Sequence, residues 1–175
     1  MKKKIIITGG LGYIGTELCK IYSGVSWHHK ITVIDNRFLS DRVNQIRNWN
    51  MNFVQGDILD KELIEKYFRD ADVVHHLAGI TQVPRTKSET SKLQDEKIKQ
   101  VGEQGTQNIL DVIKDDCKII FPSTHVVYEG IEKVKVDIKE EEVTKPVLSY
   151  SSSKAINEKQ LKDSGKNYII LRLGS

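Results

Sequence analysis

The sequence is poor in cysteine, and the two that it has stand far apart. Cys19 and Cys117 show neither metal-ligand spacing nor the cysteine density of a disulfide-stabilised secreted domain. We expect both to be reduced thiols in the core, which favours a cytoplasmic location. No metal site is expected, because the histidines also lack ligand-like neighbours.

Long apolar runs, proline-rich stretches and blocks of one charge are missing too. The apolar run after the N-terminal lysines is three isoleucines long, too short for a signal sequence or a membrane span. Lys and Arg (27) are interspersed with Asp and Glu (24), so neither nucleic-acid binding nor membrane-surface binding is expected. With three prolines and no linker-like stretch, the 175 residues are expected to form one domain, 1–175.

What is present is a regular alternation of apolar strands and amphipathic helices. Short apolar runs predict buried parallel strands at 4–8, 31–35, 52–54, 72–77, 118–122 and 167–173. Helical periodicity predicts helices at about 13–24, 60–70, 90–115 and 147–164. Residues 36–50 are short and polar, which predicts a loop with one irregular helix. This order is typical of an α/β fold with a doubly wound parallel sheet.

Two longer irregular segments follow predicted strands. Residues 79–90 come after the fourth strand, and residues 129–146 come after the fifth. Both leave the carboxyl ends of strands, where ligands bind in such sheets, and long loops are usually functional. A disordered charged surface is the alternative for residues 131–142.

The most informative motif lies where the first strand meets the first helix. Gly10 and Gly12 are expected to let the backbone turn tightly against a pyrophosphate, and Gly15 to let the helix pack close to the strand. The helix N-terminus then faces the phosphates. Asp35 ends the second strand, where an acid accepts ribose hydroxyls. The chain is therefore predicted to bind a dinucleotide.

Asp35 also predicts which dinucleotide is bound. A carboxylate can accept hydrogen bonds from both ribose hydroxyls, whereas its charge repels a 2′-phosphate. NAD is therefore expected to bind better than NADP. Arg37, two residues further along, could soften that preference.

Three other segments carry candidate chemistry, and each has a structural alternative. Tyr150 and Lys154 stand four residues apart, on one face of a helix, where the cation lowers the pKa of the phenol and makes it a usable acid or base. Chance spacing is the alternative, because the chain holds six tyrosines. Ser123 and Thr124 end a strand in hydroxyls that either position a reacting oxygen or cap a turn. Asp57 either caps a turn or contacts an adenine amino group.

These segments occur in a fixed order with other short motifs. The motifs are Thr8-Gly9-Gly10-Leu11-Gly12-Tyr13-Ile14-Gly15, Asp35-Asn36, Asp57-Ile58, His76-Leu77-Ala78-Gly79, Gly105-Thr106-Gln107-Asn108-Ile109-Leu110, Ser123-Thr124 with Val127-Tyr128, Pro146 with Tyr150, Ser153, Lys154 and Glu158, and Leu171-Arg172. In this order they resemble the extended branch of the short-chain dehydrogenase/reductase superfamily, the NAD-dependent nucleotide-sugar epimerases and dehydratases. The resemblance runs over the whole chain and implies an NAD(P)-binding Rossmann fold.

The resemblance implies roles for individual residues. Tyr150 is implied to be the catalytic acid/base, and Lys154 to lower its pKa and bind the nicotinamide ribose. Thr124 is implied to position the substrate oxygen. The implied cofactor is NAD, and the residues implied to bind it are Gly9, Gly12, Tyr13, Ile14, Gly15, Asp35, Asn36, Asp57, Ile58, Leu77, Ala78 and Lys154.

Several positions depart from the family pattern. Sugar 4,6-dehydratases carry an Asp-Glu pair after the threonine, where this chain has His125 and Val126. This difference argues against 4,6-dehydration. Gly102 stands where the branch usually has an asparagine, and Glu129 is inserted into the segment that normally reads Val-Tyr-Gly.

The expected function is that of an NAD-dependent nucleotide-sugar epimerase, which oxidises a sugar hydroxyl transiently and then reduces it again. The alternatives are a keto-sugar reductase or dehydratase of the same family and a non-catalytic dinucleotide-binding regulator. Tyr150, Lys154 and Thr124 together favour an enzyme, because a regulator needs no acid/base set.

The resemblance also implies partners and a missing part. The substrate is implied to be a nucleotide-activated sugar, and a homodimer is implied through the helices at about 90–115 and 147–164. Enzymes of this branch are considerably longer than 175 residues. We therefore expect this chain to be a fragment that lacks the small C-terminal substrate lobe.

Overall fold

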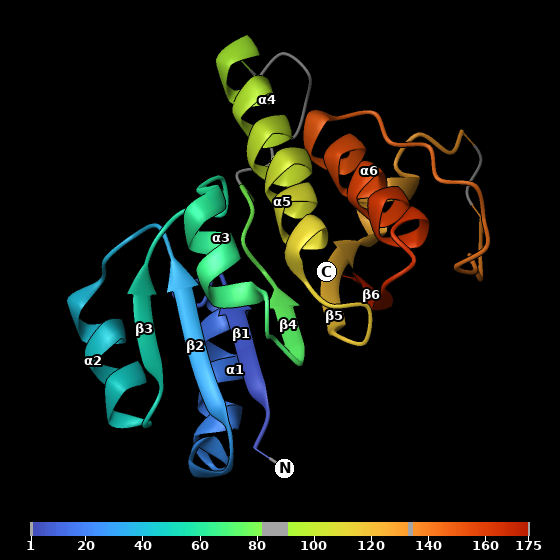
Figure 1. Ribbon diagram of the computed structural model, residues 1–175. Coiled ribbons are helices and arrows are strands. Elements are labelled where there is room, and N and C mark those ends of the chain that lie inside the picture. Colours follow the sequence, from blue (N-terminus) through green and yellow to red (C-terminus); the bar gives the residue numbers. More distant parts are fainter. Residues whose placement is uncertain (1, 82–90, 133–134, 175) are drawn as a thin grey trace.

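The computed structural model (Figure 1) describes residues 2–81, 91–132 and 135–174, and a parallel sheet forms its centre. The strands are β1 (Lys4–Thr8), β2 (Lys30–Asp35), β3 (Asn52–Gln55), β4 (Val73–His76), β5 (Lys118–Thr124) and β6 (Asn167–Leu173). The 6-stranded sheet has the order β3-β2-β1-β4-β5-β6, and every neighbouring pair is parallel. The predicted doubly wound sheet is confirmed.

Helices cover both faces of this sheet. They are α1 (Tyr13–Ser23), α2 (Ser40–Asn48), α3 (Lys61–Phe68), α4 (Lys92–Lys99), α5 (Gly105–Val112) and α6 (Ser149–Asp163), with short turns η1 (Ser26–His28), η3 (Gln100–Gln104) and η4 (His125–Tyr128). α1 and α2 pack on one face, whereas α3, α5 and α6 pack on the face turned toward the viewer in Figure 1. The sheet therefore separates two apolar cores.

The alternation of side chains along β1 supplies both cores. Ile5 and Ile7 belong to the core under α1 and α2, and Ile6 belongs to the core under α3, α5 and α6. Successive strand residues point to opposite faces, so one short apolar run serves both. Cys19 and Cys117 are free, buried thiols, one in each core, as expected. Burial raises the pKa of Cys19 to about 12 and that of Cys117 to about 11.

The strand order reverses between β1 and β4. From β1 the chain passes outward through β2 to β3, and from β4 it passes in the other direction through β5 to β6. In an open parallel sheet, ligands bind at such a reversal, in the crevice outside the carboxyl ends of the strands. This topology determines where the site lies.

One segment is more regular than its sequence indicated. Residues 36–50 were expected to form a loop with an irregular helix, but α2 is a nine-residue α-helix. Its Val43 and Ile46, three positions apart, are buried against the sheet. Within the helix these two apolar residues face the core, and Trp49, directly after its end, packs against the same core.

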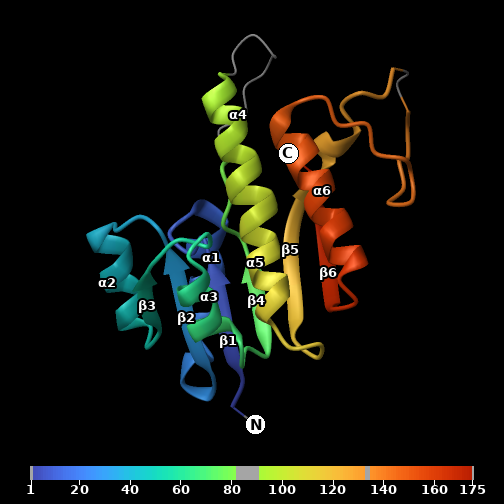
Figure 2. The same ribbon diagram turned by 45° about the horizontal axis from the view of Figure 1, so that its top comes forward.

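The long helix expected at 90–115 consists of three consecutive pieces. α4 and α5 are joined by η3, a π-helical segment, and together they form one continuous column beside α6 (Figure 2). Residue 90 lies outside the described residues. Most of the apolar residues of this column face inward, since Ile98, Ile109 and Leu110 are buried, whereas Leu93 is exposed. The homodimer stays a prediction.

The outer strand β6 is less buried than expected. Tyr168, Ile169 and Leu171 are 38%, 39% and 45% exposed. Among the described strands β6 pairs with β5 alone, so its outer edge has no neighbour there.

The two predicted loops are described only in part. Residues 82–90 of the first and residues 133–134 of the second lie outside the described residues. The described part of 129–146 contains neither helix nor strand, as expected. Within the described ranges, no helix has both the length and the apolar content needed to cross a membrane.

Candidate active site

A cleft of about 1120 Å³ opens at the carboxyl ends of the strands. Every residue to which the family resemblance gives a catalytic or cofactor-binding role lines it. These residues are Gly9, Gly12, Tyr13, Ile14, Gly15, Asp35, Asn36, Asp57, Ile58, Leu77, Ala78, Thr124, Tyr150 and Lys154. The fold therefore brings the predicted residues together at one place.

Glycines shape the turn between β1 and α1. Gly9 has a φ of +65°, and a Cβ there would lie 2.8 Å from the backbone nitrogen of Ala78. A Cβ on Gly15 would lie 2.4 Å from the carbonyl oxygen of Gly9, so α1 can begin this close to the turn only with glycine at that position. The N-terminus of α1 consequently lines the cleft, with first-turn N–H groups that have no partner within the helix.

Gly10 has a different role from the one expected. It is not among the residues that line the cleft. A Cβ at this position would lie 2.0 Å from Cγ1 of Val33 in the core. Glycine is therefore required here by packing against β2 rather than by a phosphate.

Asp35 lies at the end of β2, 5% exposed, and all its acceptor positions are occupied. The N–H of Leu11 donates to Oδ2 (3.0 Å), and the N–H of Arg37 donates to Oδ1 (3.0 Å). The guanidinium of Arg37 folds back and donates through Nε to Oδ1 (3.1 Å) and through Nη2 to Oδ2 (3.2 Å). Arg42 of α2 donates to the carbonyl of Leu11. Arg37 therefore pairs with the acid that was predicted to bind ribose, and Arg42 lines the same cleft.

Asp57 caps a turn and also lines the cleft. Its Oδ1 accepts the N–H of Leu59 (3.0 Å), and its Oδ2 accepts Nδ2 of Asn36 (3.2 Å). The neighbouring Ile58 is held by Asn108 of α5, whose Nδ2 donates to the Ile58 carbonyl (3.1 Å). The predicted turn cap is present, and the adenine contact stays a prediction.

A buried hydrogen-bond chain fixes the wall of the cleft at the end of β4. His76, 1% exposed, is hydrogen-bonded through Nδ1 to Oγ1 of Thr8 and through Nε2 to Oγ1 of Thr106, each at 3.0 Å. The N–H of Ala78 donates to the same Thr8 oxygen (3.0 Å). Burial, with a smaller contribution from Lys154, lowers the pKa of His76 to about 3. A neutral imidazole therefore ties β1, β4 and α5 together beneath the cleft.

The two hydroxyls at the end of β5 have different partners. Thr124 lines the cleft, and its Oγ1 accepts the N–H of Val126 (3.2 Å) at the start of η4. The cap considered as an alternative is present, and the O–H of Thr124 can still donate, because a hydroxyl both donates and accepts. Ser123 instead donates to Oε1 of Glu158 (2.6 Å).

Glu158 anchors the helix that carries Tyr150 and Lys154. Arg172 of β6 donates to it through Nε (2.9 Å to Oε1) and Nη2 (2.5 Å to Oε2), and both side chains are largely buried. Although burial raises the pKa of Glu158, hydrogen bonds from Arg172 and Ser123 bring it below its ordinary value. α6 is thereby joined to β5 and β6.

Tyr150 and Lys154 both line the cleft from α6, as helical spacing predicts. Nζ of Lys154 donates to the carbonyl of Pro122 (2.9 Å) and lies 4.3 Å from the centre of the Phe121 ring. It lies 6.0 Å from the centre of the Tyr150 ring. The ammonium is therefore directed at the end of β5 rather than at the phenol.

This geometry corrects the expected pKa of the tyrosine. We expected Lys154 to lower the pKa of the Tyr150 phenol, but burial raises it. Burial also lowers the pKa of Lys154 to about 8, although Glu158 opposes that shift. The reason is that the two groups share a low-dielectric wall, which disfavours both charged forms.

The N-terminus of α6 is capped from the preceding loop. Oε1 of Glu129 accepts the N–H groups of Val147 and Leu148, each at 2.7 Å, and the hydroxyl of Ser151. These contacts satisfy free donors at the start of the helix, next to Tyr150. The inserted glutamate therefore holds the helix that carries the candidate acid/base.

Sequence reasoning missed several residues that line the cleft, among them Arg42, Gln100 and Val101. Arg42 lies in the segment expected to be a loop. The spacing of Val43 and Ile46 was the signal that could have predicted α2 and thus Arg42. Gln100 and Val101 belong to the π-helical η3, which a periodicity of 3.6 does not anticipate.

A second cavity, of about 440 Å³, lies beside the ends of β5 and β6. It is lined by His125, Val126, Tyr128, Glu129, Ile138, Lys139, Glu140 and Arg172, and by none of the predicted site residues. Nδ1 of His125 is hydrogen-bonded to the carbonyl of Leu173 (3.1 Å). Among the described side chains, no group of His, Cys, Asp and Glu is arranged to hold a metal ion.

Known proteins resemble this chain over almost its whole length. It is 30% identical over 172 residues to a UDP-glucose 4-epimerase of Neisseria meningitidis serogroup C, covering 92% of this chain and 48% of that protein. It is 30% identical over 170 residues to a dTDP-D-glucose 4,6-dehydratase of Dictyostelium discoideum, covering 87% and 38%. The chain thus spans less than half the length of these relatives.

Solved structures are also similar to this chain over almost its whole length. The structure of a UDP-glucose 4-epimerase from Brucella ovis in complex with NAD matches with a TM-score of 0.76 and 30% sequence identity, over 96% of this chain and 50% of that one. The family model for the NAD-dependent epimerase/dehydratase family matches residues 5–175. The chain therefore belongs to the NAD-dependent epimerase/dehydratase family.

Proposed function

We propose that this chain binds NAD in the cleft at the carboxyl ends of its strands. The observation that carries the proposal is that the Gly9–Gly15 turn, Asp35 and two residues of α6, Tyr150 and Lys154, line one cleft of about 1120 Å³. The residues fit the cofactor for a geometric reason. A Cβ at Gly9 or Gly15 would collide with neighbouring backbone. The glycines therefore allow the tight turn that places the N-terminus of α1 at the cleft. The related Brucella ovis epimerase, solved in complex with NAD, supports the same choice.

Three side chains are proposed to act on the substrate. When bound, NAD supplies a reversible acceptor for the hydride of a sugar carbinol, which permits oxidation followed by re-reduction. Thr124 donates its O–H to the reacting sugar oxygen and orients it. Tyr150 exchanges a proton with that oxygen, and Lys154 balances the charge on the phenol and holds a ribose hydroxyl. Because burial lowers the pKa of Lys154 to about 8, its ammonium also releases a proton readily.

The proposed reaction is the epimerisation of a nucleotide-activated sugar. His125 and Val126 favour this over 4,6-dehydration, since an imidazole and an isopropyl group do not provide a pair of carboxyls. His125, moreover, lines the second cavity rather than the cleft. A keto-sugar reductase remains the second candidate, because the same Thr124, Tyr150 and Lys154 would serve a single reduction.

Product analysis distinguishes these functions. A turnover-competent protein that contains this chain is incubated with NAD and a panel of UDP-, dTDP-, GDP- and ADP-activated sugars. An epimer formed without net reduction of NAD is the expected result. Net consumption of NADH on a keto-sugar would identify a reductase, and accumulation of a 4-keto-6-deoxy sugar would identify a dehydratase. NAD binding without any turnover on the panel would favour a regulator.

We also infer a cytoplasmic location. Two buried, unpaired thiols support it, because secreted domains usually use cysteines as disulfides. The inference concerns the compartment alone and is independent of the reaction.

A further inference from the structure

An exposed apolar tip lies at the end of the molecule opposite the cleft. Ile21 at the end of α1 is 75% exposed, Val25 is 42% exposed, and Trp27 in η1 is 70% exposed. We call these three residues, together with the surrounding Lys2, Lys3, Lys20 and Lys30, the tryptophan tip.

The backbone of the tip is held in place by hydrogen bonds. Ser26 is buried, and its hydroxyl donates to the carbonyl of Ser23 (3.2 Å). The N–H of His28 donates to the carbonyl of Val25 (3.0 Å). The indole of Trp27 packs edge-to-face on His28, with 5.3 Å between ring centres. Trp27 is therefore displayed by a structured turn.

The tip is basic as well as apolar. The N–H of Lys30 donates to the carbonyl of Lys3 (2.8 Å), which brings the starts of β1 and β2 together beside η1. None of the four lysines of the tip lies within salt-bridge distance of an acid among the described residues. Glu17 is the one acidic residue before Asp35 in the sequence. Asp72, just before β4, has a carboxyl whose pKa is lowered mainly by the hydrogen bond from the N–H of Lys4, and the charge of Lys3 lies close enough to lower it further. The unpaired positive charge of the tip therefore rests on Lys2, Lys20 and Lys30.

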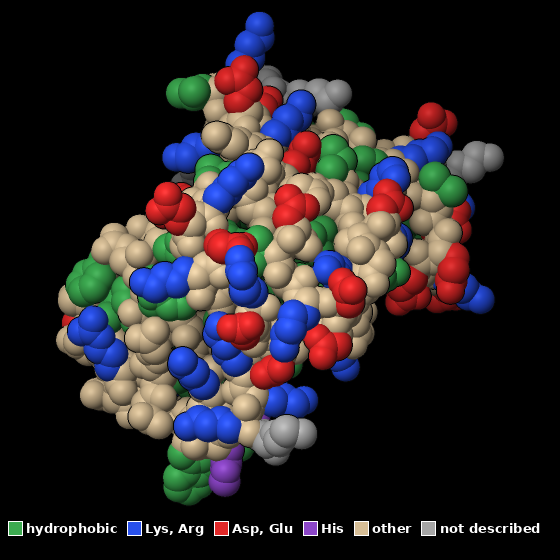
Figure 3. All heavy atoms as spheres, viewed as in Figure 1, with side chains coloured by type: hydrophobic (Ala, Val, Ile, Leu, Met, Phe, Trp, Pro, Cys, Tyr) green, Lys and Arg blue, Asp and Glu red, His purple; other side chains and the backbone are tan. Residues whose placement is uncertain are grey.

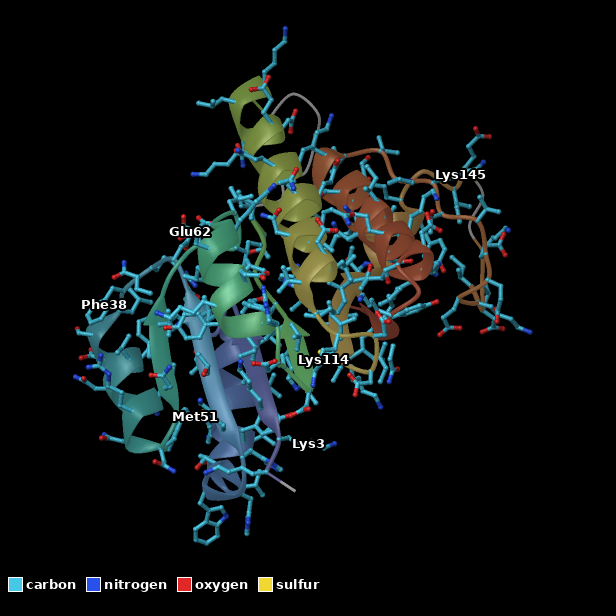
Figure 4. All side chains as sticks on the ribbon, viewed as in Figure 1. Lys3, Phe38, Met51, Glu62, Lys114 and Lys145 are labelled. Carbon is cyan, nitrogen blue, oxygen red and sulfur yellow. The ribbon has the colours of Figure 1, made fainter. Side chains whose placement is uncertain are left out.

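The shape of the tip decides which partner it fits. Figure 3 shows hydrophobic and histidine side chains projecting from the lower end of the molecule, with Lys and Arg side chains above them. Lys3 lies at the same end in Figure 4. A projecting group of three apolar side chains is too small for a specific protein interface, which buries about 800 Å² per partner. A lipid surface, by contrast, accepts a projecting tryptophan at the level of its headgroups.

We propose that the tryptophan tip docks this protein on an anionic membrane surface. The indole, Ile21 and Val25 enter the headgroup region, and the lysines pair with lipid phosphates and carboxylates. The amino ends of the strands then face the lipid, and the cleft at the carboxyl ends faces away from it, open to its ligands. Anionic lipids are concentrated in the cytoplasmic leaflet, which agrees with a cytoplasmic protein.

This proposal reverses the expectation drawn from charge in the sequence. The residues of the tip are spread from Lys2 to Lys30, so no basic block or amphipathic run marks them. The strand pairing and the turn at η1 gather them at one end.

Tryptophan fluorescence tests the proposal on the chain itself. The chain has two tryptophans, so Trp49→Phe leaves Trp27 as the only tryptophan, and selective excitation of tryptophan reports on the tip. This variant is titrated with vesicles of equal parts phosphatidylserine and phosphatidylcholine, and with vesicles of phosphatidylcholine alone. We expect the emission to shift to shorter wavelength with the anionic vesicles only, and added salt to reverse the shift.

Co-sedimentation with the same vesicles tests individual residues. Trp27→Ala is expected to weaken binding more than about ten-fold, and Lys20→Ala about five-fold, the effect of one lysine near an anionic surface. Ile21→Ala is expected to weaken binding, whereas Val143→Ala, at a matched exposure of 74%, leaves it unchanged. Lys99→Ala on α4 is the matched lysine control, because Lys99 is exposed and has no salt-bridge partner among the described residues.

Several results would overturn the proposal. They are no binding to anionic vesicles, equal binding to neutral ones, or equal effects of Ile21→Ala and Val143→Ala. Self-association that Trp27→Ala abolishes, without vesicle binding, would identify a second copy of the chain as the occupant. Circular dichroism of each variant checks that the fold is intact.

Discussion

At the scale of single residues, Asp35 is expected to control both the affinity for the cofactor and its choice. A carboxylate accepts about four hydrogen bonds, and here the Arg37 guanidinium takes two of them. Ribose hydroxyls must therefore displace that side chain. Asp35→Ala should weaken NAD binding about ten- to hundred-fold, the effect of losing hydrogen bonds to a charged group.

Calorimetry with NAD and NADP measures this effect. The unchanged chain is expected to prefer NAD, and Asp35→Asn should narrow the preference, because the amide no longer repels a 2′-phosphate. Tighter binding of NADP by the unchanged chain, or no loss of NAD affinity in Asp35→Ala, contradicts the assignment.

Tyr150 is expected to matter for rate rather than for binding. In a turnover-competent protein that contains this chain, Tyr150→Phe should lower the rate by about 10²–10⁴-fold, the usual size of a general acid–base contribution. NAD affinity should change little, because the ring is retained and only the hydroxyl is lost. A rate equal to that of the unchanged protein would remove Tyr150 from the proposed mechanism.

The sequence predicted the identity of these residues better than their partners. Asp35, Thr124 and Tyr150 follow from motif spacing, because a strand end or a helix face dictates where each side chain lies. The folding of Arg37 onto Asp35 and the direction of the Lys154 ammonium depend on side-chain rotamers. No spacing rule encodes those, so the raised pKa of Tyr150 was not foreseen.

At the scale of elements, β4 carries two histidines that should make the protein sensitive to acid. His75 is hydrogen-bonded to the Tyr22 hydroxyl (2.8 Å) on one face of the sheet. His76 is hydrogen-bonded to the Thr8 hydroxyl on the other face. Burial lowers the pKa of His75 to about 4, and burial with Lys154 lowers that of His76 to about 3. Below pH 6.5 the unfolded chain therefore binds protons that the folded chain does not.

The contribution of these two histidines to the free energy of unfolding should accordingly be fully present above pH 6.5. It should be lost progressively as the pH drops toward 3 to 4. Each histidine contributes a slope of about 1.4 kcal/mol per pH unit in that range. Urea unfolding at several pH values is the measurement, and His76→Gln should reduce the slope by about that amount. The same change at exposed His28 is the control, and equal slopes for the two variants would contradict this account.

The π-helical segment η3 is expected to depend on Gly102. A Cβ there would lie 2.2 Å from Oγ of Ser153 on α6, and Nδ2 of Asn157 donates to the Gly102 carbonyl (3.0 Å). Gly102→Ala should therefore lower the free energy of unfolding by about 1–3 kcal/mol, the usual cost of overpacking. Adding Ser153→Ala should restore most of the loss, because the colliding oxygen is then removed.

Urea unfolding of the single and double variants measures this coupling. Gly24→Ala is the matched control, since the nearest atom to its Cβ would be 3.8 Å away. A Gly102→Ala variant as stable as Gly24→Ala would show that η3 does not require close contact with α6.

At this scale the sequence predicted strands more reliably than helix details. Buried strands are short continuous apolar runs, and such runs can be recognised in the sequence without knowing which strands pair with them. The helix α2 was obscured because only Val43 and Ile46 face the core. η3 was obscured because a π-helical turn departs from the 3.6-residue periodicity by which helices are recognised in a sequence.

At the scale of the whole molecule, the chain contains a complete candidate cofactor site but covers only part of the length of its relatives. Every residue proposed to bind NAD lies within these 175 residues and lines one cleft. The chain covers about half of the solved Brucella ovis epimerase and less than half of the matched curated relatives. The remaining part of those relatives has no counterpart in this sequence.

We therefore expect the isolated chain to bind NAD but to turn over nucleotide sugars at a rate close to nil. Cofactor binding needs the glycine turn, Asp35 and α6, all of which are present. Turnover needs the reacting carbon to be held against the nicotinamide, and a displacement of about 1 Å already costs about 10²-fold. Calorimetry with NAD and an epimerase assay on the same preparation test the two halves separately. Robust epimerase activity from these 175 residues alone would show that the cleft described here holds the sugar as well as the cofactor.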